Sequence, residues 1–419
     1  MRSAIGKTMA VTLLTLSAST YGLAANSGLW KFEALESSVE IGSLPEDKPF
    51  KLPENYSQSV LVNETTFNIY NNTSPNGADW PDMNTVNETG KHAGRYLYRT
   101  HEVRPGDDLE AYEGGALSVM DMRTGKTKVL AQRKDWEALD GIVWTPWQTI
   151  LFAEETGMAK FSDPDAPTSY RGLLYEAKPD PSNPSELSWI KVRPLLGSMS
   201  HEGIEIDAEG NVYVIDEYKQ GAIYKFVPKR YGQLDEGQLY ALKLDSGDTG
   251  TARWVPLDMD LAQTDSRIAA SDINATSYCR PEDLERIGNT LYVALTCDHA
   301  VLSIKLKDTP VVDYFIKQGV NAPIESGAQP GFHKPDNLAK GPDGRLWIVE
   351  DNKPSDIWVA SPDHNNDGQA DKVELFGSLS TTGAEASGIY FGLDPRKLFV
   401  NIQHSANGND KTIIISPSK

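Results

Sequence analysis

Acidic residues recur at the start of short apolar segments along this chain, and they are the residues best suited to do chemistry. They are Asp140, Glu202, Glu282, Asp336 and, near the last copy of the pattern, Glu385. Several carboxylates that converge in a space without water cannot all stay ionised unless a cation neutralises them. The sequence therefore predicts a metal site with more than one ion, provided that the fold brings these acids together. The alternative, for any single copy, is an acid that only caps a turn.

The segments that carry these acids have the pattern of β-hairpins. Lys334 to Asn352 contains a Pro-Asp-Gly turn, followed by a continuously apolar strand. This sequence pattern, which contains Asp336, is repeated around Glu202, Glu282 and Ser387. The successive copies at Glu202, Glu282, Asp336 and Ser387 are 80, 54 and 51 positions apart. Such spacings fit one four-stranded blade per copy, with insertions in the longer ones.

We therefore predict an all-β protein, a β-propeller of six blades with loop insertions. In a propeller the innermost strands line a central channel, so acids at their heads would meet there. Asp163 to Pro194 holds many of the prolines and is expected to be a loop-rich insertion. Asn26 to Asn87 is polar and is expected to be loop-rich too.

The first residues predict export. Met1 to Ala25 combines Arg2 and Lys7, an apolar run and small residues at its end, which is the pattern of a secretory signal peptide. A membrane anchor would need about 20 unbroken apolar residues, and no later segment is long enough to span a bilayer. We expect a secreted or periplasmic protein whose residues 26–419 form one propeller domain. The formal net charge of −19 disfavours nucleic acid and anionic lipid as partners and suits cations such as calcium.

The two cysteines, Cys279 and Cys297, lie at equal distances from Gly288, which falls in a predicted hairpin turn. They should face each other across two antiparallel strands, within reach of a disulfide, which an exported protein tolerates. Two buried free thiols are the alternative.

A second metal pattern lies outside the repeated sequence pattern. Oxygen-bearing side chains occupy the first, third, fifth, seventh, ninth and twelfth places of a calcium-loop spacing, and Gly368 stands sixth, where such a loop turns sharply. These residues are Asp363, Asn365, Asp367, Gln369, Asp371 and Glu374. No amphipathic helices flank them, so we expect a structural calcium loop between strands. A polar turn without a metal is the alternative.

Five motifs, in the same order along the chain, resemble the PhoX-type alkaline phosphatases. They are Thr145-Pro146-Trp147 before Glu154-Glu155, His201-Glu202-Gly203, Arg280-Pro281-Glu282-Asp283, Pro335-Asp336-Asn337-Leu338 and Phe399-Val400-Asn401-Ile402-Gln403-His404. The resemblance extends from about His101 to His404. It implies a β-propeller that hydrolyses phosphomonoesters with a calcium–iron cluster in its channel.

The resemblance also implies roles for individual residues. Arg280 would hold the phosphoryl oxygens, because its planar guanidinium binds them in pairs and never loses its charge. A salt bridge from Arg280 to Glu282 or Asp283 is the alternative. The residues expected at or near the metal cluster are Glu155, Glu202, Glu282, Asp336, Asn337 and Glu385.

The sequence departs from the family pattern at one expected ligand. Where the family places a cysteine thiolate on iron, this chain has Asp140. A carboxylate in place of a soft thiolate favours hard cations, so Ca²⁺ is the expected cofactor and Fe³⁺ the second candidate. The chain is also shorter than the usual members of the family.

Together these observations predict an exported, monomeric, metal-dependent phosphatase that acts on a small-molecule phosphate ester. Its ions would clamp the phosphate and activate a water or oxide nucleophile. Two other hypotheses remain open. One is a calcium-dependent lactonase, and the other is a propeller that binds without catalysis.

Overall fold

The computed structural model describes residues 28–67, 69, 80–103, 114–156, 162–327 and 330–418. The predicted signal peptide, Met1 to Ala25, lies outside these residues. Within the described part, no helix is long and apolar enough to cross a membrane.

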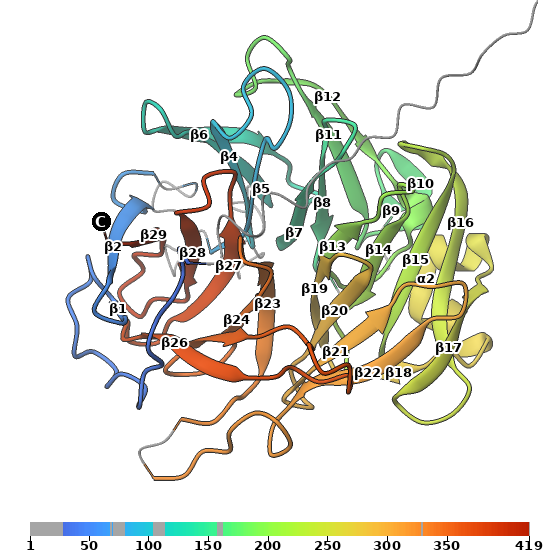
Figure 1. The fold of residues 1–419 in the computed structure, drawn as a ribbon. Coiled ribbons are helices and arrows are strands. Elements are labelled where there is room, and N and C mark those ends of the chain that lie inside the picture. Colours follow the sequence, from blue (N-terminus) through green and yellow to red (C-terminus); the bar gives the residue numbers. More distant parts are fainter. Residues whose placement is uncertain are drawn as a thin grey trace, which may run out of the picture.

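Four antiparallel sheets of four or five strands form most of the molecule (Figure 1). The first contains β3 (Pro81–Val86), β4 (Tyr96–His101), β5 (Ala116–Asp121) and β6 (Lys126–Gln132). The second contains β7 (Leu139–Trp144), β8 (Ile150–Glu154), β11 (Leu174–Pro179) and β12 (Leu187–Val192). The third contains β23 (Pro335–Lys340), β24 (Leu346–Glu350), β25 (Asp356–Ala360), β26 (Val373–Leu379) and β1 (Phe50–Lys51). The fourth contains β27 (Glu385–Phe391), β28 (Leu398–Gln403), β29 (Lys411–Pro417) and β2 (Tyr56–Asn63).

A fifth sheet is longer and has ten strands. One part contains β13 (His201–Ile206), β14 (Val212–Asp216), β15 (Gly221–Arg230), β16 (Gln233–Leu244) and β17 (Gly250–Pro256). The other part contains β19 (Pro281–Ile287), β20 (Thr290–Leu295), β21 (Ala300–Lys305) and β22 (Val311–Lys317). β17 pairs with β22 and so joins the two parts, and the short β18 (Ser277–Tyr278) pairs with β15.

Few elements lie outside these sheets. They are the two-stranded sheet of β9 (Ser162–Asp163) and β10 (Ala166–Tyr170), the 3-10 helix η1 (Pro194–Leu196) and the α-helix α2 (Met259–Asp272). Asp258 caps α2, since its side chain accepts hydrogen bonds from the backbone N–H groups of Asp260 and Leu261.

The inner strands are packed in a closed ring. Going round it, β3 lies against β7, β7 against β13, β13 against β19, β19 against β23, β23 against β27, and β27 against β3. The ring is closed by pairing between the two ends of the chain, because β2 pairs with β29 in the fourth sheet. The predicted all-β, propeller-like fold is therefore confirmed, with two parts of the expected propeller merged into one extended sheet.

Apolar side chains fill the spaces between neighbouring sheets. Trp347 and Phe376 of the third sheet pack with Ile402 and Ile413 of the fourth, and Trp30 from the N-terminal segment completes this cluster. These large side chains have no contact with solvent. Because β24 is covered on both faces, its central residues Trp347 to Val349 are continuously apolar.

One expectation about loops was wrong, and a second holds only in part, since residues 28–49 contain no helix or strand. Asp163 to Pro194, expected to be a loop-rich insertion, contains the two outer strands β11 and β12 of the second sheet. The proline-rich turn between these strands is short, and the strands are antiparallel partners with one register shift between Lys178 and Pro179. Asn26 to Asn87 likewise ends in a ring strand, β3, whose six residues are all buried.

Candidate metal centre

Each ring strand begins with a β-bulge. In β3, β7, β13, β19 and β23 the pairing with the next strand skips two residues near the start, and the first of these two is the acid. A bulge bends the strand and redirects its side chains, so the acid leaves the regular alternation. The five acids, called head acids below, are Asp82, Asp140, Glu202, Glu282 and Asp336. In β27 the same place is taken by Gly388, which has a positive φ of 53°.

A second acid lies beside most of these head acids. It directly follows the next strand of the same sheet. A repeated backbone hydrogen bond places it there. The N–H of Glu102, Glu155, Glu217 and Asp351 donates to the carbonyl of the residue two positions before the head acid, over 2.8–3.0 Å. At β19 the equivalent residue is Thr296, whose N–H donates to the carbonyl of Arg280 over 3.1 Å.

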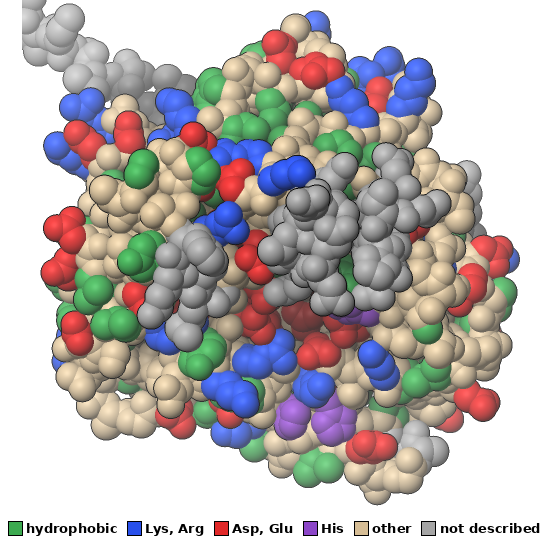
Figure 2. Space-filling model, turned by 180° about the vertical axis from the view of Figure 1, so that it is seen from behind, with side chains coloured by type: hydrophobic (Ala, Val, Ile, Leu, Met, Phe, Trp, Pro, Cys, Tyr) green, Lys and Arg blue, Asp and Glu red, His purple; other side chains and the backbone are tan. Residues whose placement is uncertain are grey.

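These side chains meet in one cavity of about 190 Å³. It is lined by ten carboxylates, one arginine, one histidine and one glutamine, namely Asp82, Glu102, Asp140, Glu155, Glu202, Glu217, Glu282, Asp336, Asp351, Glu385, Arg280, His404 and Gln403. Figure 2 shows Asp and Glu side chains gathered in a hollow near the centre of one face of the molecule. The predicted convergence of the acids from different strands therefore occurs.

Three overlapping groups of carboxylates could each hold a cation. In each group the ligand oxygens lie within 4.8 Å of one another. The groups are Asp82, Glu102 and Asp140; Asp140, Glu155 and Glu202; and Glu202, Glu217 and Glu282. Each combines one head acid, the second acid of the same sheet, and the head acid of the next ring strand. The series stops at Glu282 because Thr296 stands where a further acid would be needed.

Burial makes the charges of this cavity costly. Asp82, Asp140, Glu202 and Glu282 are each less than 8% exposed. Burial raises the pKa of these four carboxyls well above the ordinary range, and neighbouring carboxylates raise it further. Among the described residues, the buried Oδ1 of Asp140 finds no hydrogen-bond partner. A buried carboxylate oxygen without a donor, surrounded by other acids, is what a cation would satisfy.

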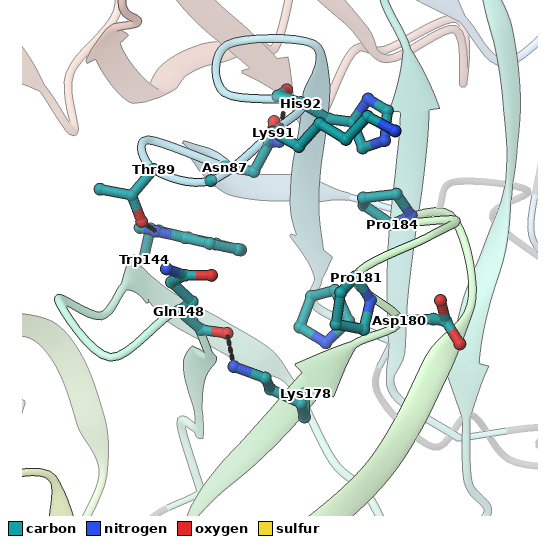
Figure 3. A pocket seen from close by; sticks show the side chains of 12 residues that line it. Asn87, Thr89, Lys91, His92, Trp144, Gln148, Lys178, Asp180, Pro181 and Pro184 are labelled. Atoms are coloured by element: carbon teal, nitrogen blue, oxygen red, sulfur yellow. Dashed lines mark hydrogen bonds between the residues drawn. The ribbon is translucent and has the colours of Figure 1, made fainter.

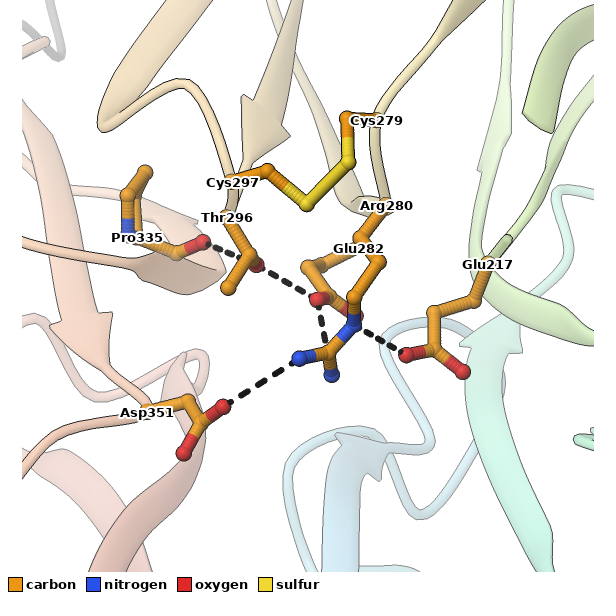
Figure 4. The surroundings of a disulfide bond; sticks show 8 residues. All are labelled: Glu217, Cys279, Arg280, Glu282, Thr296, Cys297, Pro335 and Asp351. Carbon is orange, nitrogen blue, oxygen red and sulfur yellow. Dashed lines mark hydrogen bonds and ion pairs between the residues drawn. A yellow bond between two sulfur atoms is a disulfide. The ribbon is translucent and has the colours of Figure 1, made fainter. Parts of the chain in front are cut away.

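Arg280 is held by three carboxylates of this cavity. Its Nε donates to Glu217 over 2.7 Å, its Nη2 lies 3.0 Å from Glu282, and its Nη1 lies 3.5 Å from Asp351 (Figure 4). The alternative of a salt bridge to Glu282 is thus realised, but that to Asp283 is not. The side chain of Asp283 instead accepts hydrogen bonds from the backbone N–H groups of Leu284 and Leu338.

Asn337 lies beside the cavity and does not line it. Its Nδ2 donates to Asp336 over 3.1 Å, and its Oδ1 accepts from the N–H of Gly388 over 2.5 Å. Asn337 therefore orients Asp336 and ties β23 to β27. Asp283 links β19 to β23 in the same way, so the second residue of these two bulges joins neighbouring ring strands.

Glu385 reaches the cavity from a different position. It lies three residues before the bulge of β27 and forms an ion pair with His404 over 3.2 Å. Burial would raise the pKa of Glu385, but His404 outweighs burial and lowers it. The ring of His404 packs against Trp80, with ring centres 4.6 Å apart.

The predicted disulfide between Cys279 and Cys297 is confirmed. The two Cα atoms lie 5.5 Å apart, just beyond the ends of β19 and β20. Figure 4 shows that the bond lies directly beside Arg280 and Thr296.

The loop that follows the calcium-loop spacing connects β25 to β26, and Gly368 has the positive φ, 90°, of the expected turn. Asp363 accepts from the N–H groups of Asp367 and Gly368. Other acids of this loop have partners as well, because Asp371 pairs with His364 and Glu374 with Lys372. None of the three carboxylate groups above includes this loop.

Sequence reasoning missed four of the ten carboxylates that line the cavity among the described residues. They are Asp82, Glu102, Glu217 and Asp351, together with the histidine His404. A signal for Asp82 exists, since Pro81-Asp82 repeats the proline–acid pair of Pro281-Glu282 and Pro335-Asp336. Glu102, Glu217 and Asp351 directly follow strands, as Glu155 does. Their shared position was visible in the sequence, but their approach to the head acids was not.

Another hollow, of about 100 Å³, lies at the far ends of β3 and β7 (Figure 3). Its lining includes the ring of Trp144, the prolines Pro179, Pro181 and Pro184, and one carboxylate, Asp180. With a single acid, it offers no counterpart to the cation groups of the channel.

The chain was compared with known proteins. The family model described as alkaline phosphatase PhoX matches residues 143–313 and 308–406. No curated protein matches the chain significantly. The solved structure of Pseudomonas fluorescens PhoX in complex with vanadate, a transition state analogue, is similar in fold. Its TM-score is 0.67 at 18% identity, over 92% of this chain and 98% of that one.

Weaker similarities link the chain to other solved structures. A gluconolactonase from Xanthomonas campestris has a TM-score of 0.48 at 13% identity, covering 91% of this chain and 98% of that one. The soluble aldose sugar dehydrogenase of Escherichia coli has a TM-score of 0.46 at 13% identity, covering 86% of this chain and 99% of that one. Similarities at this level support no argument about function.

Proposed function

The chain belongs to the alkaline phosphatase PhoX family, and from this premise we propose that its acidic channel is the active site of an exported, metal-dependent phosphatase that hydrolyses phosphate esters. One observation carries the proposal. Three overlapping carboxylate groups and one arginine share a single buried cavity. Cations bound by such groups and an arginine fork together suit the recognition of a phosphoryl group.

We propose that the ring belongs to a single six-bladed propeller domain. The extended sheet then counts as two blades, one led by β13 and the other by β19. This counting is supported by the ring, because β13 and β19 each contact their neighbours in the same way as the first strands of the other sheets.

The residues of the cavity fit hard cations. Every ligand atom of the three groups is a carboxylate oxygen, which Ca²⁺ prefers. Asp140, in the place where the family has a thiolate, belongs to two of the groups, and both cysteines of the chain are joined to each other. No thiolate is therefore offered to iron, and we propose calcium as the principal metal, with Fe³⁺ as the second candidate.

Replacement of Asp140 by cysteine tests this choice of metal. The Asp140→Cys variant should bind more iron than the parent protein, because it restores a soft ligand. Elemental analysis of both proteins, purified side by side, measures the change. Iron in the parent at the level of the variant would contradict the preference for calcium.

When bound, the cations would supply the positive charge that stabilises a phosphoryl group during transfer and that activates the attacking water. The chain's own residues would do the rest. The carboxylates of Glu217 and Glu282 now hold Arg280, and both also belong to a candidate cation group. Cations would compete for these carboxylates and so leave the guanidinium available to two phosphoryl oxygens.

The test is a comparison of substrates. The purified protein is assayed with a chromogenic phosphate monoester, a phosphodiester and a sugar lactone, each with and without a chelator, and after calcium is added back. We expect hydrolysis of a phosphate ester that the chelator abolishes and calcium restores. Hydrolysis of the lactone alone would indicate the calcium-dependent lactonase. Metal binding without turnover of any substrate would indicate a binding protein.

Export is supported by the disulfide, because such bonds persist in oxidising compartments. We propose that Met1 to Ala25 is removed and that the protein is secreted or periplasmic. Mass spectrometry of the protein recovered from each cell fraction tests this, and an intact N-terminus in the cytosolic fraction alone would contradict it.

A further inference from the structure

The Cys279–Cys297 disulfide lies beside two residues of the candidate site (Figure 4). Cys279 precedes Arg280, and Cys297 follows Thr296, whose hydroxyl contacts Glu282. We propose that this disulfide is a positioning element that keeps Arg280 and Glu282 in place in the channel wall. The inference rests on the proposed function, since it names what holds the phosphate-binding arginine.

Arg280 adopts a left-handed backbone conformation that recurs at Trp80, Ala138 and Lys334, the equivalent residues before β3, β7 and β23. Its φ is 47°, in the left-handed region that residues with side chains rarely adopt. Its N–H donates to the carbonyl of Tyr218 over 2.8 Å, and its carbonyl accepts from Thr296 over 3.1 Å. The disulfide adds a covalent link between the residue before Arg280 and the residue after Thr296.

Thr296 connects the other end of the disulfide to the metal groups. Its hydroxyl lies within hydrogen-bond distance of the carboxylate of Glu282 and, at 3.0 Å, of the carbonyl of Pro335. It is 2% exposed. The position of Thr296 therefore decides where Glu282 points, and Glu282 belongs to only one of the three carboxylate groups.

The fold itself does not require this bond. The backbone hydrogen bond between Thr296 and Arg280 recurs at β3, β7, β13 and β23, where no disulfide accompanies it. Lys334, which precedes β23 as Arg280 precedes β19, has a side chain that is 44% exposed and does not line the cavity. β19 is the ring strand with the disulfide beside it, and Arg280, the residue that precedes this strand, reaches into the cavity. We therefore assign the disulfide a role in positioning.

The experiment compares the wild-type protein with the double variant Cys279→Ala/Cys297→Ala. We expect kcat/KM for a phosphate ester to fall by about 10- to 100-fold, the range that a small misplacement of a binding group produces. Calcium titration should show weaker binding at the group that contains Glu282, with the sites at Asp82 and Asp140 retained. Circular dichroism should show the native β-structure in both proteins.

Two further comparisons separate positioning from general stability. Reductant should lower the activity of the wild-type protein, reoxidation should restore it, and the double variant should respond to neither. Thr296→Val should reproduce the loss of calcium at the Glu282 group, and Thr296→Ser, which keeps the hydroxyl, should restore it. Should the double variant fail to fold, the two Thr296 variants decide the question.

The inference is overturned if removal of the disulfide leaves both the calcium titration and kcat/KM within twofold of the wild-type values. It is also overturned if Thr296→Val binds calcium as Thr296→Ser does. A wild-type protein that hydrolyses no phosphate ester would refute the proposed function instead. The calcium titration would then still decide whether the disulfide positions Glu282.

Discussion

Two regions of this molecule are rich in acidic residues, but their carboxylates differ in burial and in the partners that they have. In the loop from Asp363 to Glu374, most carboxylates are exposed or half-buried and each has a local partner. Asp363 is satisfied by two backbone N–H groups, Asp371 by His364, and Glu374 by Lys372. In the channel, the described residues that line the cavity include ten carboxylates but one arginine and one histidine.

The difference shows that the number of acids does not by itself make a metal site. The loop acids come from one short segment, so the backbone that brings them together also supplies their hydrogen bonds. The channel acids come from six different ring strands and their neighbours, and no donor among the described residues reaches Oδ1 of Asp140. Buried negative charge without a donor is what calls for a cation.

The largest effect is expected from Glu202→Gln, which removes the charge shared by two carboxylate groups. Phosphate ester hydrolysis should fall by about 10²-fold or more, as when a preorganised electrostatic group is lost. The metal-free variant should melt no lower than the metal-free parent, because one repulsive charge has gone. Asp367→Asn in the exposed loop is the matched control, and an equal loss of activity in both variants would erase the contrast between the regions.

Arg280→Lys should have the next largest effect. It keeps the positive charge near Glu217 and Glu282 but loses the planar fork, so turnover should drop by roughly 10²-fold. Steady-state kinetics measure the drop, and thermal melting should show nearly unchanged stability. Full activity in the lysine variant would mean that the arginine serves only as a counter-charge, which would leave the channel without its phosphate-binding group.

The pH dependence of stability should distinguish the metal-free from the calcium-bound protein. Buried channel acids such as Asp140 and Glu202 have a pKa above the unfolded value of about 4. The folded protein therefore binds more protons than the unfolded chain, and stability is lost as pH rises through the folded pKa values. Melting temperatures with chelator should fall from pH 5 to pH 8.

Calcium should reduce this fall without abolishing it. Burial also raises the pKa of Glu154 to about 8 and of Asp283 to about 7, and neither side chain lines the cavity. Their contribution should remain when calcium is bound. Identical pH profiles with chelator and with calcium would show that the channel acids are not neutralised by the metal.

The smallest effect is expected from Asp363→Ala in the loop. It removes the acceptor for the N–H groups of Asp367 and Gly368 and should lower the free energy of unfolding by about 1 kcal/mol. Activity should be unchanged. If the loop binds calcium, as its spacing predicts, added calcium should raise the melting temperature of the parent more than that of the variant. An equal rise in both would show the loop to be a polar turn.

Part of the site could be predicted because the repeated sequence pattern marks it. Glu202, Glu282 and Asp336 stand at the same place in successive copies, and each lies at a bulge facing the channel. Asp82 was missed because the polar stretch before it hid a buried strand. Glu102, Glu217 and Asp351 were missed because their position after a strand does not show in the sequence that they approach another acid. Only the pairing between strands brings them beside a head acid.

The sequence by itself determined the local features of this protein. Alternation of turn residues and apolar strands indicates the hairpins, and equal spacing about Gly288 indicates the disulfide, because both depend on contacts between residues close in the chain. Tertiary structure decided what depends on distant segments. Ser387 reaches Asp82 across more than 300 positions, and β2 closes the ring with β29. Such contacts leave no periodic trace in a single sequence, since any residue of suitable size and polarity could serve. Only the closed ring brings the carboxylates of the channel together.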